Sequence, residues 1–319
     1  METQSIAILL AVYEPNELWL TQLLDSLDRQ TYPHLHLYVR DDASPTYPLQ
    51  RLEQMLREHV TRFPFTLRQN EGNLGSNGTF ARLVEDCKEN YIAFCDHDDV
   101  WLPEKLEKSL SLLRESPLHP TLVCANVSVV DGEGALIASR IDEHRRRHVF
   151  LRGEGIASQL IYRNFVMGCT VVMERERALR YLPFPDEAVH DHYLAFRAAC
   201  DGAIDYLDEP VMLYRVYGGN QTGVMTGVKT KEDYFCRRIK SFDDRLRCFE
   251  AYSDVPEIQK ARAWSHARMD NYNRKCGSFG ALYRTRAANP VTTWFELIGL
   301  RLPPPLFRLA IRLIRKGIL

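Results

Sequence analysis

Three aspartates follow a short apolar segment in the first third of the chain. Residues 91–95 are bulky and apolar, as in a strand buried on both faces, and Asp96, Asp98 and Asp99 come directly after them. An isolated charge in an apolar core costs too much free energy, so these carboxylates must lie beyond the carboxyl end of the strand. Asp96 and Asp98 are spaced to share a hard cation such as Mg²⁺ or Mn²⁺, whose other ligands would be phosphate oxygens. The alternative is a solvated acidic turn that caps the helix expected from Pro103.

A second candidate carboxylate, Asp191, lies between His190 and His192, where a loop is expected to enter a helix. A carboxylate at the start of a helix is often only a cap, so that interpretation stays open. The two histidines suggest a metal site, but they lack the i, i+4 spacing of a helical zinc motif. A carboxylate at such a junction can also be held near a hydroxyl and accept its proton, which is the chemistry of a general base.

The elements that must position these acids alternate between strand and helix. Strands are expected at residues 5–12, 35–39, 66–68 and 91–95, and a helix at residues 49–62. Another helix follows the first strand, with an apolar stripe formed by Leu20, Leu23, Leu24 and Leu27. This alternation predicts an α/β fold with a doubly wound, mostly parallel sheet. Its loops gather at one edge, where ligands bind in such folds.

Two more segments are expected at that edge. Asp41 and Asp42 end the second strand, and residues 70–78 form a loop with three glycines and three asparagines, among them Asn73 and Gly75. Such a loop allows close backbone approach and can hold a phosphate at a helix N-terminus. It lacks the G-x-G-x-x-G fingerprint, so an ordinary turn is an equal alternative.

The remaining elements complete the predicted sheet domain. A helix is expected from Pro103, with an inward face made by Leu102, Leu106, Leu110 and Leu113. A further helix is expected at residues 153–162, and strands at residues 122–130, 168–173, 203–207 and 211–215.

Composition divides the chain of 319 residues into two parts. Its net charge of −1 conceals an asymmetry, because residues 226–319 carry 19 Lys and Arg against 9 Asp and Glu. We therefore expect a sheet domain at residues 1–225 and a helical, basic region at residues 226–319. A basic end on an acidic body indicates an anionic partner, either a membrane surface or a polyanion.

The eight cysteines form no CxxC pair and no zinc-type spacing, which fits a reducing cytosol. No stretch has a signal-peptide layout or the roughly 18 apolar residues of a membrane span. The expected location is therefore cytoplasmic, with peripheral attachment to the inner face of the cell membrane as a further possibility.

The end of the chain, residues 306–319, predicts a basic amphipathic helix. Its basic side carries Arg308, Arg312, Arg315 and Lys316, and its apolar side carries Leu306, Leu309 and Leu313. Such a helix is too short and too charged to cross a bilayer but is suited to an anionic interface, and Trp294 and Phe295 lie nearby in the sequence. Equally, its apolar side can pack on its own domain or on a partner subunit.

Seven short motifs stand in a characteristic order along residues 6–223. They are Leu10-Ala11-Val12-Tyr13, Arg40-Asp41-Asp42-Ala43-Ser44, Asn73-Leu74-Gly75, Cys95-Asp96-His97-Asp98-Asp99-Val100-Trp101, Gly168-Cys169-Thr170, His190-Asp191-His192-Tyr193, and Tyr214-Arg215 with Gly218-Gly219-Asn220. Each is weak alone, but their order and spacing resemble those of the family 2 inverting glycosyltransferases with the GT-A fold. The resemblance is greatest to bacterial rhamnosyltransferase-type members that build O-antigen or other surface polysaccharides.

This resemblance implies a role for each matching position. The metal site would use Asp96 and Asp98, with Asp98 as the direct ligand, Asp191 would be the catalytic base, and Arg215 would lie near the donor diphosphate. The nucleotide would be held by Ala11, Tyr13, Asp41, Asp42, Asn73 and Gly75, with Asp42 favoured for the base. Acceptor or secondary positions would be Asp99, Trp101, His190, His192 and Tyr217.

The chain departs from the family pattern at two places. The family often has His where this chain has Tyr217, and Trp after the base where this chain has His192-Tyr193. These differences affect a second contact to metal or diphosphate and the stacking of the acceptor. The implied partners are a dTDP- or UDP-sugar donor, a glycan or lipid-linked acceptor, and a membrane surface met through the C-terminal helix.

Two other functions use the same residues. One is a catalytically idle module that binds a nucleotide sugar or metal within a membrane assembly, and the other is a metal-dependent phosphatase or nucleotidyltransferase. Nucleic-acid binding is not expected, because the basic region lacks interleaved aromatics and a recognised binding fold.

Overall fold

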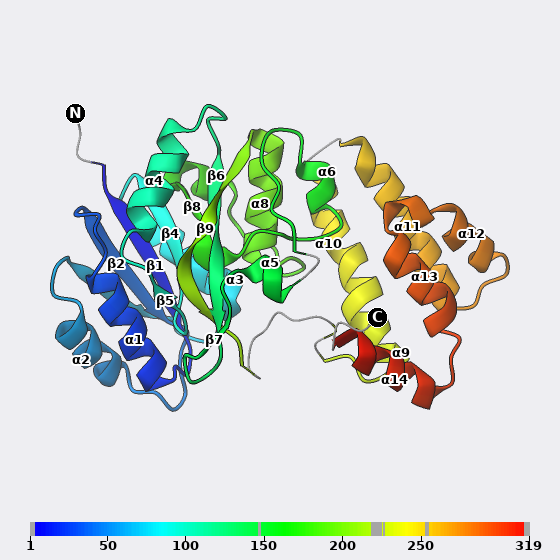
Figure 1. The fold of residues 1–319 in the computed structure, drawn as a ribbon, viewed down its shortest axis with the longest axis horizontal. Helices are drawn as coiled ribbons and strands as arrows, with labels where there is room; N and C mark the ends of the chain where they lie inside the picture. The colour runs from blue at the N-terminus through cyan, green and yellow to red at the C-terminus, as the bar shows by residue number, and fades with distance from the viewer. Residues whose placement is uncertain (1–3, 146–147, 218–224, 226, 253–254, 316–319) are drawn as a thin grey trace. The chain divides into compact units, whose positions relative to one another are not determined.

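A computed structural model describes residues 4–145, 148–217, 225, 227–252 and 255–315 of the chain. It divides into two compact units, one formed by Met1–Leu160 with Asn164–Tyr217 and the other by Ile161–Arg163 with Gly218–Leu319 (Figure 1). The short segment Ile161–Arg163 therefore belongs to the second unit, although its neighbours on both sides belong to the first.

The first unit is built on a mixed sheet, with nine strands in the described residues. In chain order these are β1 (Ile6–Val12), β2 (Leu35–Asp41), β3 (Phe65–Gln69), β4 (Tyr91–Asp96), β5 (Val100–Trp101), β6 (Leu122–Val130), β7 (Leu136–Ala138), β8 (Val172–Glu174) and β9 (Ile204–Arg215). The spatial order is β3-β2-β1-β4-β8-β6-β9-β5, with β7 beside β6. Strands β3, β2, β1 and β4 are parallel, whereas β8 runs antiparallel between β4 and β6.

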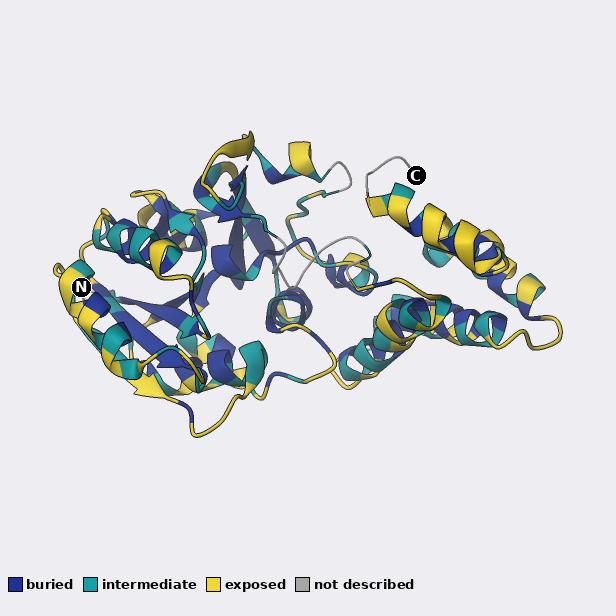
Figure 2. Cartoon of the chain, turned by 90° about the horizontal axis from the view of Figure 1, so that it is seen from below, coloured by how far each residue is buried: buried dark blue, intermediate teal, exposed yellow. Residues whose placement is uncertain are grey.

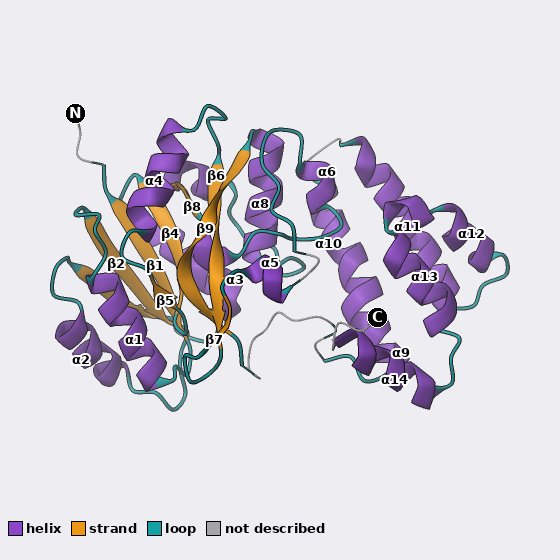
Figure 3. Ribbon diagram, viewed as in Figure 1, coloured by secondary structure: helices purple, strands orange, loops and turns teal. Residues whose placement is uncertain are grey.

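Helices cover both faces of this sheet (Figure 3). The longer ones are α1 (Glu17–Asp28), α2 (Leu49–His59), α3 (Gly75–Asp86), α4 (Lys105–Glu115) and α8 (His190–Asp201), and the shorter ones are α5 (Ile141–His144), α6 (Ala157–Leu160) and α7 (Arg175–Arg180). Alternate residues of β1 and β4 pack into one core with α1, α2 and α4. The opposite side of β4 meets α3, where Phe94 and Phe80 lie 5.3 Å apart between ring centroids. The predicted α/β fold is confirmed.

The register of the parallel strands brings the predicted site residues together. Ala11 of β1 lies opposite Asp96 of β4 on one side, and Val12 lies opposite Asp41 of β2 on the other. The carboxyl ends of three strands thus meet at one edge, because parallel strands all point the same way. The predicted gathering of acids at that edge follows from this pairing.

Several predicted elements are shorter than expected or differ in type. Residues 153–162 contain only the short helix α6, and residues 168–173 contain a 3-10 turn (Gly168–Thr170) before β8. The two strands expected at residues 203–207 and 211–215 form one strand, β9, with irregular register against β6. The glycine-rich loop is shorter than expected, since α3 begins at Gly75.

The helix expected from Pro103 also differs in its inward face. It begins at Lys105, and Leu102 is 37% exposed while Lys105 is 1% exposed. A lysine therefore takes a core position that the sequence pattern assigned to leucine.

The second unit is helical, as predicted. Its elements are α9 (Lys231–Tyr234), a π-helical turn (Phe235–Lys240), α10 (Ser241–Glu250), α11 (Pro256–Tyr272), α12 (Ser278–Arg284), a 3-10 turn (Arg286–Ala288), α13 (Pro290–Gly299) and α14 (Pro304–Arg315). Arg268 and Glu296 form a buried bidentate ion pair with N–O distances of 2.7 and 3.0 Å. Tyr234 donates a hydrogen bond to the same carboxylate at 2.9 Å.

The amphipathic helix α14 packs within this unit. Phe307 and Ile311 are buried with Tyr234 and Leu300, whereas Leu306 and Leu309 are 50% and 49% exposed (Figure 2). Of the two interpretations left open for the apolar side of this helix, packing within the chain holds for Phe307 and Ile311, whereas Leu306 and Leu309 are exposed. Among the described helices, none is both long and apolar enough to cross a membrane.

Candidate active site

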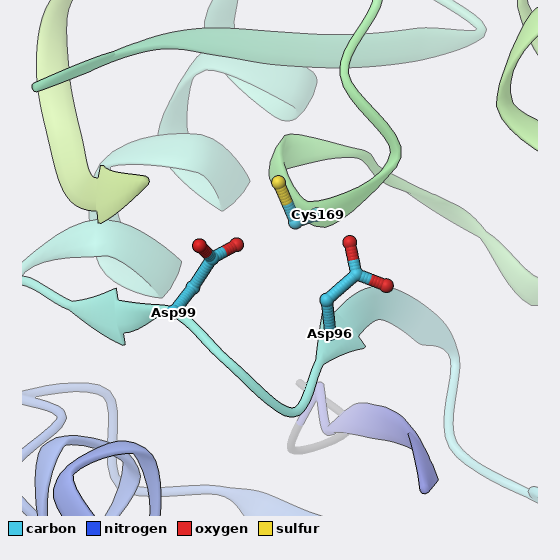
Figure 4. Close-up of side chains that lie close together, drawn as sticks. All are labelled: Asp96, Asp99 and Cys169. Carbon is cyan, nitrogen blue, oxygen red and sulfur yellow. The ribbon is translucent and has the colours of Figure 1, made fainter. Parts of the chain in front are cut away.

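Two aspartates and a cysteine meet at the carboxyl end of β4. One ligand atom from each of Asp96, Asp99 and Cys169 lies within 4.8 Å of the others, and Figure 4 shows the three side chains around one space. Asp99 is 1% exposed, and its Oδ1 accepts a hydrogen bond from the backbone N–H of Arg215 at 2.9 Å. Its Oδ2 is buried and accepts no hydrogen bond from an N–H or O–H of the described residues. An orphaned carboxylate oxygen of this kind fits a cation.

The electrostatics of the cluster indicate the same ligand chemistry. Burial raises the pKa of Asp96 to about 7, and the charges of Asp98 and Asp191 act in the same direction. Burial, together with Asp98 and Asp96, also raises the pKa of Asp99 well above its usual value. Crowded carboxylates favour a hard divalent cation, which removes their mutual repulsion. The residues present therefore fit Mg²⁺ or Mn²⁺.

A buried lysine, Lys105, contacts the acidic cluster through Cys169. The Nζ atom of Lys105 donates a hydrogen bond to the carbonyl oxygen of Cys169 at 2.5 Å and lies 3.1 Å from the ring centroid of Trp101. Burial lowers the pKa of Lys105 to about 8, while Asp99 and Asp96 act in the opposite direction. Trp101, which was predicted as a secondary site residue, is 2% exposed and serves as the platform for this ammonium group.

Asp98 is hydrogen-bonded to the segment that follows β9. Its Oδ2 accepts a hydrogen bond from the hydroxyl of Tyr217 at 2.9 Å, and burial and the Asp98 charge raise the pKa of that hydroxyl. The Tyr217 ring packs on Trp19 with 4.7 Å between centroids. The pair Asp98–Tyr217 thus ties the loop after β4 to the segment after β9, at the position where the family often has His.

Arg215 is held by several protein groups. It is 2% exposed, its Nε donates to the carbonyl oxygen of Asp98 at 2.9 Å, and one terminal nitrogen donates to Gln22 at 2.7 Å. The guanidinium also lies 5.1 Å from the Trp19 ring and donates to the Gly132 carbonyl at 3.2 Å. In this arrangement Arg215 shapes the loop that carries Asp98, and its contact with a diphosphate stays a prediction.

Asp191 occupies the first turn of α8. Its Oδ1 accepts a hydrogen bond from Asn164 Nδ2 at 3.0 Å, and its Oδ2 accepts one from the backbone N–H of Gly168 at 3.2 Å. Burial raises the pKa of Asp191 to about 6, against the effect of backbone N–H groups of His192 and Gly168. The side chain therefore has fixed oxygens and a basicity suited to proton transfer near neutral pH.

The two histidines beside Asp191 are structural in this conformation. His190 is 5% exposed, and its ring centroid lies 4.5 Å from that of Phe80; burial lowers its pKa to about 3. His192 is 6% exposed, and its Nε2 lies 2.5 Å from the Leu160 carbonyl oxygen. His190 is therefore neutral at physiological pH, and both rings anchor the start of α8.

Asn77 fixes the loop that leads to Asp191. Its Nδ2 donates to the carbonyl oxygens of Pro185 and Ala188, both at 2.7 Å, and its Oδ1 accepts from the backbone N–H of His190 at 2.9 Å. One amide side chain on α3 thus makes three hydrogen bonds with residues more than one hundred positions away. This contact sets where α8 begins.

The acids at the end of β2 organise the neighbouring loops. Asp41 accepts hydrogen bonds from Ser44 Oγ at 2.6 Å and Gln69 Nε2 at 2.8 Å. Asp42 accepts from Asn70 Nδ2 and from the backbone N–H of Leu74, both at 2.7 Å. Both carboxylates are held by local donors at the edge where the nucleotide site was predicted.

The remaining predicted nucleotide residues lie on the same loops. Tyr13 follows β1 and is 44% exposed, so its ring is accessible for stacking. The Ala11 carbonyl oxygen lies 3.4 Å from His97 Nδ1. Asn73 accepts a hydrogen bond from the backbone N–H of Gly75, which has φ of +68° at the start of α3. That positive φ explains why glycine stands there.

Four residues of the site were missed from the sequence. Asn77 on α3 and Asn164 in a loop carry common side chains, and only the tertiary structure shows their partners. Lys105 gave a local signal, since it is a charge one residue before Leu106 on an otherwise apolar helix face. Cys169 was part of a quoted motif but was given no role.

Comparison with known proteins agrees with this geometry. The family model for glycosyl transferase family 2 matches residues 7–177, more than half of the chain. The chain therefore belongs to glycosyl transferase family 2 and is a glycosyltransferase.

Two relatives illustrate the similarity in sequence. The dTDP-rhamnosyl transferase RfbG of Shigella flexneri is 25% identical over 228 residues, which cover 67% of this chain and 74% of RfbG. The Escherichia coli protein WfgD, named as UDP-Glc:alpha-D-GlcNAc-diphosphoundecaprenol beta-1,3-glucosyltransferase, is 23% identical over 194 residues, 61% of this chain and 69% of WfgD.

Two solved structures show the same fold. TarS 1-349 of S. aureus in complex with UDP-GlcNAc has a TM-score of 0.59 at 17% identity, covering 98% of this chain and 92% of that one. The mannosyltransferase PcManGT of Pyrobaculum calidifontis, in complex with GDP-Man and Mn²⁺, has a TM-score of 0.57 at 16% identity, covering 99% and 87%. The fold is thus GT-A-like, with a mixed sheet between helices and a helical C-terminal region.

Proposed function

We propose that this chain is a metal-dependent, inverting glycosyltransferase that moves a sugar from a nucleotide-diphospho donor to an acceptor hydroxyl. The observation that carries the proposal is geometric: the backbone N–H of Gly168 donates a hydrogen bond to Asp191, and the next residue, Cys169, lies in one cluster with Asp96 and Asp99. A cation site and a candidate base therefore face a common region, as a single displacement requires.

The donor site in this proposal lies along the ends of β1, β2 and β4. Tyr13 and Asp42 contact the base, Asp41 the ribose, and the Ala11, Asn73 and Gly75 backbones line the nucleotide. Arg215 supports the diphosphate, directly or through the Asp98 loop that it holds. The complexes of TarS with UDP-GlcNAc and of PcManGT with GDP-Man support a nucleotide-sugar donor for this fold.

Asp96 and Asp98 hold the cation in this proposal, and the orphaned oxygen of Asp99 faces the same space. When bound, Mg²⁺ or Mn²⁺ supplies Lewis-acid stabilisation for the departing diphosphate. Tyr217, bonded to Asp98, orients that carboxylate, and Lys105 offsets part of the negative charge of the acidic cluster. The complex of PcManGT with both GDP-Man and Mn²⁺ supports the use of a divalent cation.

Asp191 is the base. It takes the proton of the acceptor hydroxyl as the oxygen attacks the anomeric carbon, and the bond from that carbon to the diphosphate oxygen breaks with its electron pair on the diphosphate. The transition state resembles an oxocarbenium ion, as in glycoside hydrolysis. Attack from the face opposite to the leaving group inverts the anomeric centre. Asn164 and the Gly168 N–H hold the Asp191 oxygens in place for this transfer.

The finer substrate assignment follows the relatives. A dTDP-sugar donor, with rhamnose favoured, is proposed from RfbG, with a UDP-sugar as the other candidate from WfgD. The acceptor is a growing surface glycan or a lipid-linked sugar, as the name of WfgD indicates for that protein. Such an acceptor places the enzyme at the cytoplasmic face of a membrane, which its basic second unit would approach.

The substitution Asp191→Asn tests the mechanism. It keeps the shape of the side chain and its bond from Gly168 but removes the base, so transfer should fall by about 10²–10⁴-fold while donor affinity changes little. Transfer is measured with a panel of nucleotide sugars and Mn²⁺, and donor affinity by calorimetry. Asp186→Asn, an exposed carboxylate in the loop before α8, is the matched control.

The outcomes separate the competing functions. Near-normal turnover of the Asp191→Asn variant would remove Asp191 from the mechanism. Donor binding without transfer or donor hydrolysis in the unmodified protein would indicate an idle binding module. Release of pyrophosphate or phosphate instead of nucleoside diphosphate would indicate a nucleotidyltransferase or phosphatase.

A further inference from the structure

Helices α12 and α13 present an apolar face to solvent among the described residues of the second unit. It consists of Phe279 and Tyr283 on α12 and Val291, Trp294 and Ile298 on α13, which are 48%, 39%, 59%, 48% and 60% exposed. We refer to these five side chains as the α12–α13 face. The α13 members have i, i+3 and i+7 spacing and so form one stripe, and Tyr283 joins the helices through a contact of 5.7 Å with the Trp294 ring. An exposed cluster of this kind marks a binding surface.

The end of the chain carries mostly positive charges. Residues 273–319 contain nine Lys and Arg and one acid, Glu296, which is fully buried in its ion pair with Arg268, while Lys275 pairs with the partly exposed Asp270 of α11 at 2.7 Å. Two of the arginines border the face directly. The guanidinium of Arg286 lies 4.1 Å from the Tyr283 ring, and that of Arg301 lies 4.9 Å from the Phe279 ring. Apolar and aromatic side chains bordered by arginines are typical of interfacial membrane contacts.

We propose that the α12–α13 face binds the surface of an anionic lipid bilayer. Trp294, Ile298 and their neighbours enter the headgroup boundary, and the surrounding arginines contact anionic headgroups. This inference adds a membrane-binding surface to the proposed function. It rests on that function, because a lipid-linked acceptor is the reason for the enzyme to approach a membrane. The proposed contact lies on α12 and α13, whereas the sequence placed a membrane contact on the C-terminal helix, of which Phe307 and Ile311 are buried in the unit and Leu306 and Leu309 are exposed.

Charge favours a bilayer over a second copy of the chain. In a two-fold contact the same face meets itself, so Arg286 and Arg301 of one copy would approach those of the other, and none of the five residues of the face is acidic. An anionic lipid surface instead neutralises these arginines. Binding should therefore require anionic lipid and weaken as salt is added.

The test is flotation of the full chain with vesicles of phosphatidylcholine, with and without phosphatidylglycerol. The unmodified chain should float only with the anionic vesicles. The double variant Trp294→Ser with Ile298→Ser should lose flotation by roughly tenfold or more, because two large apolar side chains no longer enter the interface. The matched control is Leu306→Ser with Leu309→Ser, an equally exposed pair on α14, which should float as the unmodified chain does.

A spectroscopic measurement locates the contact independently. Of the four tryptophans, Trp101 and Trp264 are each 2% exposed, whereas Trp294 is 48% exposed. Tryptophan emission should shift to the blue with anionic vesicles, and Trp294→Phe should remove the shift while flotation persists. Equal flotation of the α13 double variant, or loss of flotation in the α14 pair alone, would overturn the proposal. A third result would also overturn it: the unmodified chain does not float and sediments as a dimer, whereas the α13 double variant sediments as a monomer.

Failure of this inference can be told from failure of the enzyme assignment. The α13 double variant should keep normal transfer to a water-soluble acceptor and normal donor affinity. If the unmodified protein is active but does not float, only the membrane-binding proposal is rejected. If the Asp191→Asn variant is fully active, the proposed mechanism is rejected and the flotation result still stands.

Discussion

At the scale of single residues, the site is governed by carboxylates that differ in their surroundings. Asp96 and the buried Asp99 are crowded together, and so favour a cation, whereas Asp191 is fixed by hydrogen bonds from Asn164 and from the Gly168 N–H. The same functional group can thus serve as a metal ligand or as a base, and its environment selects between them.

The pH dependence of transfer should report Asp191. Burial raises its pKa to about 6, and a base acts only when deprotonated, so activity should be lost as pH falls through about 6. With saturating Mn²⁺, which compensates the facing charge of Asp96, log kcat/KM should fall with unit slope below that value and be level above it. A profile without an acid limb in this range would contradict the assignment.

Loss of a hydrogen bond to Asp191 should shift the acid limb of the pH profile to higher pH. Asn164→Ala removes a hydrogen bond to ionised Asp191, so the apparent pKa of the base should rise and activity should decline at higher pH than in the unmodified enzyme. Asn90→Ala is the control, since the Asn90 side chain accepts an exposed hydrogen bond from the Ser5 N–H at 3.3 Å. An unchanged profile in the Asn164 variant would show that Asn164 does not influence the base.

At the scale of elements, the site depends on the close approach of the 3-10 turn at Gly168–Thr170 to the start of α8. A Cβ at Gly168 would lie 3.1 Å from His190 Nε2 and 3.2 Å from Asp191 Cβ, both tighter than ordinary contact. The absence of a side chain at this position is therefore part of how the turn delivers its N–H to the Asp191 carboxylate.

Gly168→Ala should displace Asp191 without touching the donor site. We expect kcat to fall by about 10–100-fold, because small misplacements of a catalytic group are costly, with little change in the donor KM. Gly72→Ala is the matched control, since a Cβ there meets no atom within 4 Å among the described residues. Full activity of the Gly168 variant would show that this approach is not needed for catalysis.

At the scale of the whole molecule, the two units have separate cores with different chemistry. The first is organised around its sheet, and the second around the buried pair Arg268–Glu296, with the Trp264 ring 4.3 Å from the guanidinium. We therefore expect a substitution in one core to destabilise mainly the unit that contains it.

Glu296→Gln should destabilise the second unit selectively. It leaves Arg268 buried without a counter-charge, which should lower the free energy of unfolding of that unit by about 3–5 kcal/mol. Denaturant unfolding followed by tryptophan emission measures this change, with the exposed Glu232→Gln as control. The stabilisation of the first unit by nucleotide and Mn²⁺ should persist in the variant. An unchanged unfolding midpoint would show that the Arg268–Glu296 pair makes no net contribution to the free energy of unfolding.

Local pattern in the sequence determined the α/β class, the order of strands β1 to β4 and the position of the acids after β4. These features follow from short-range regularities, namely apolar runs, helical stripes and the cost of burying charge. The helical, basic second part was likewise evident from composition and periodicity.

The tertiary structure alone decided which side chains meet. The insertion of β8 between β4 and β6, the bonds from Asn77 to the loop before α8, and the burial of Lys105 under the acids all join segments far apart in the chain. Local propensity carries no record of such contacts, because their free energy arises only when distant groups are brought together out of water. For the same reason the side of α14 that packs, and the face of α13 that remains exposed, could be assigned only from the folded chain.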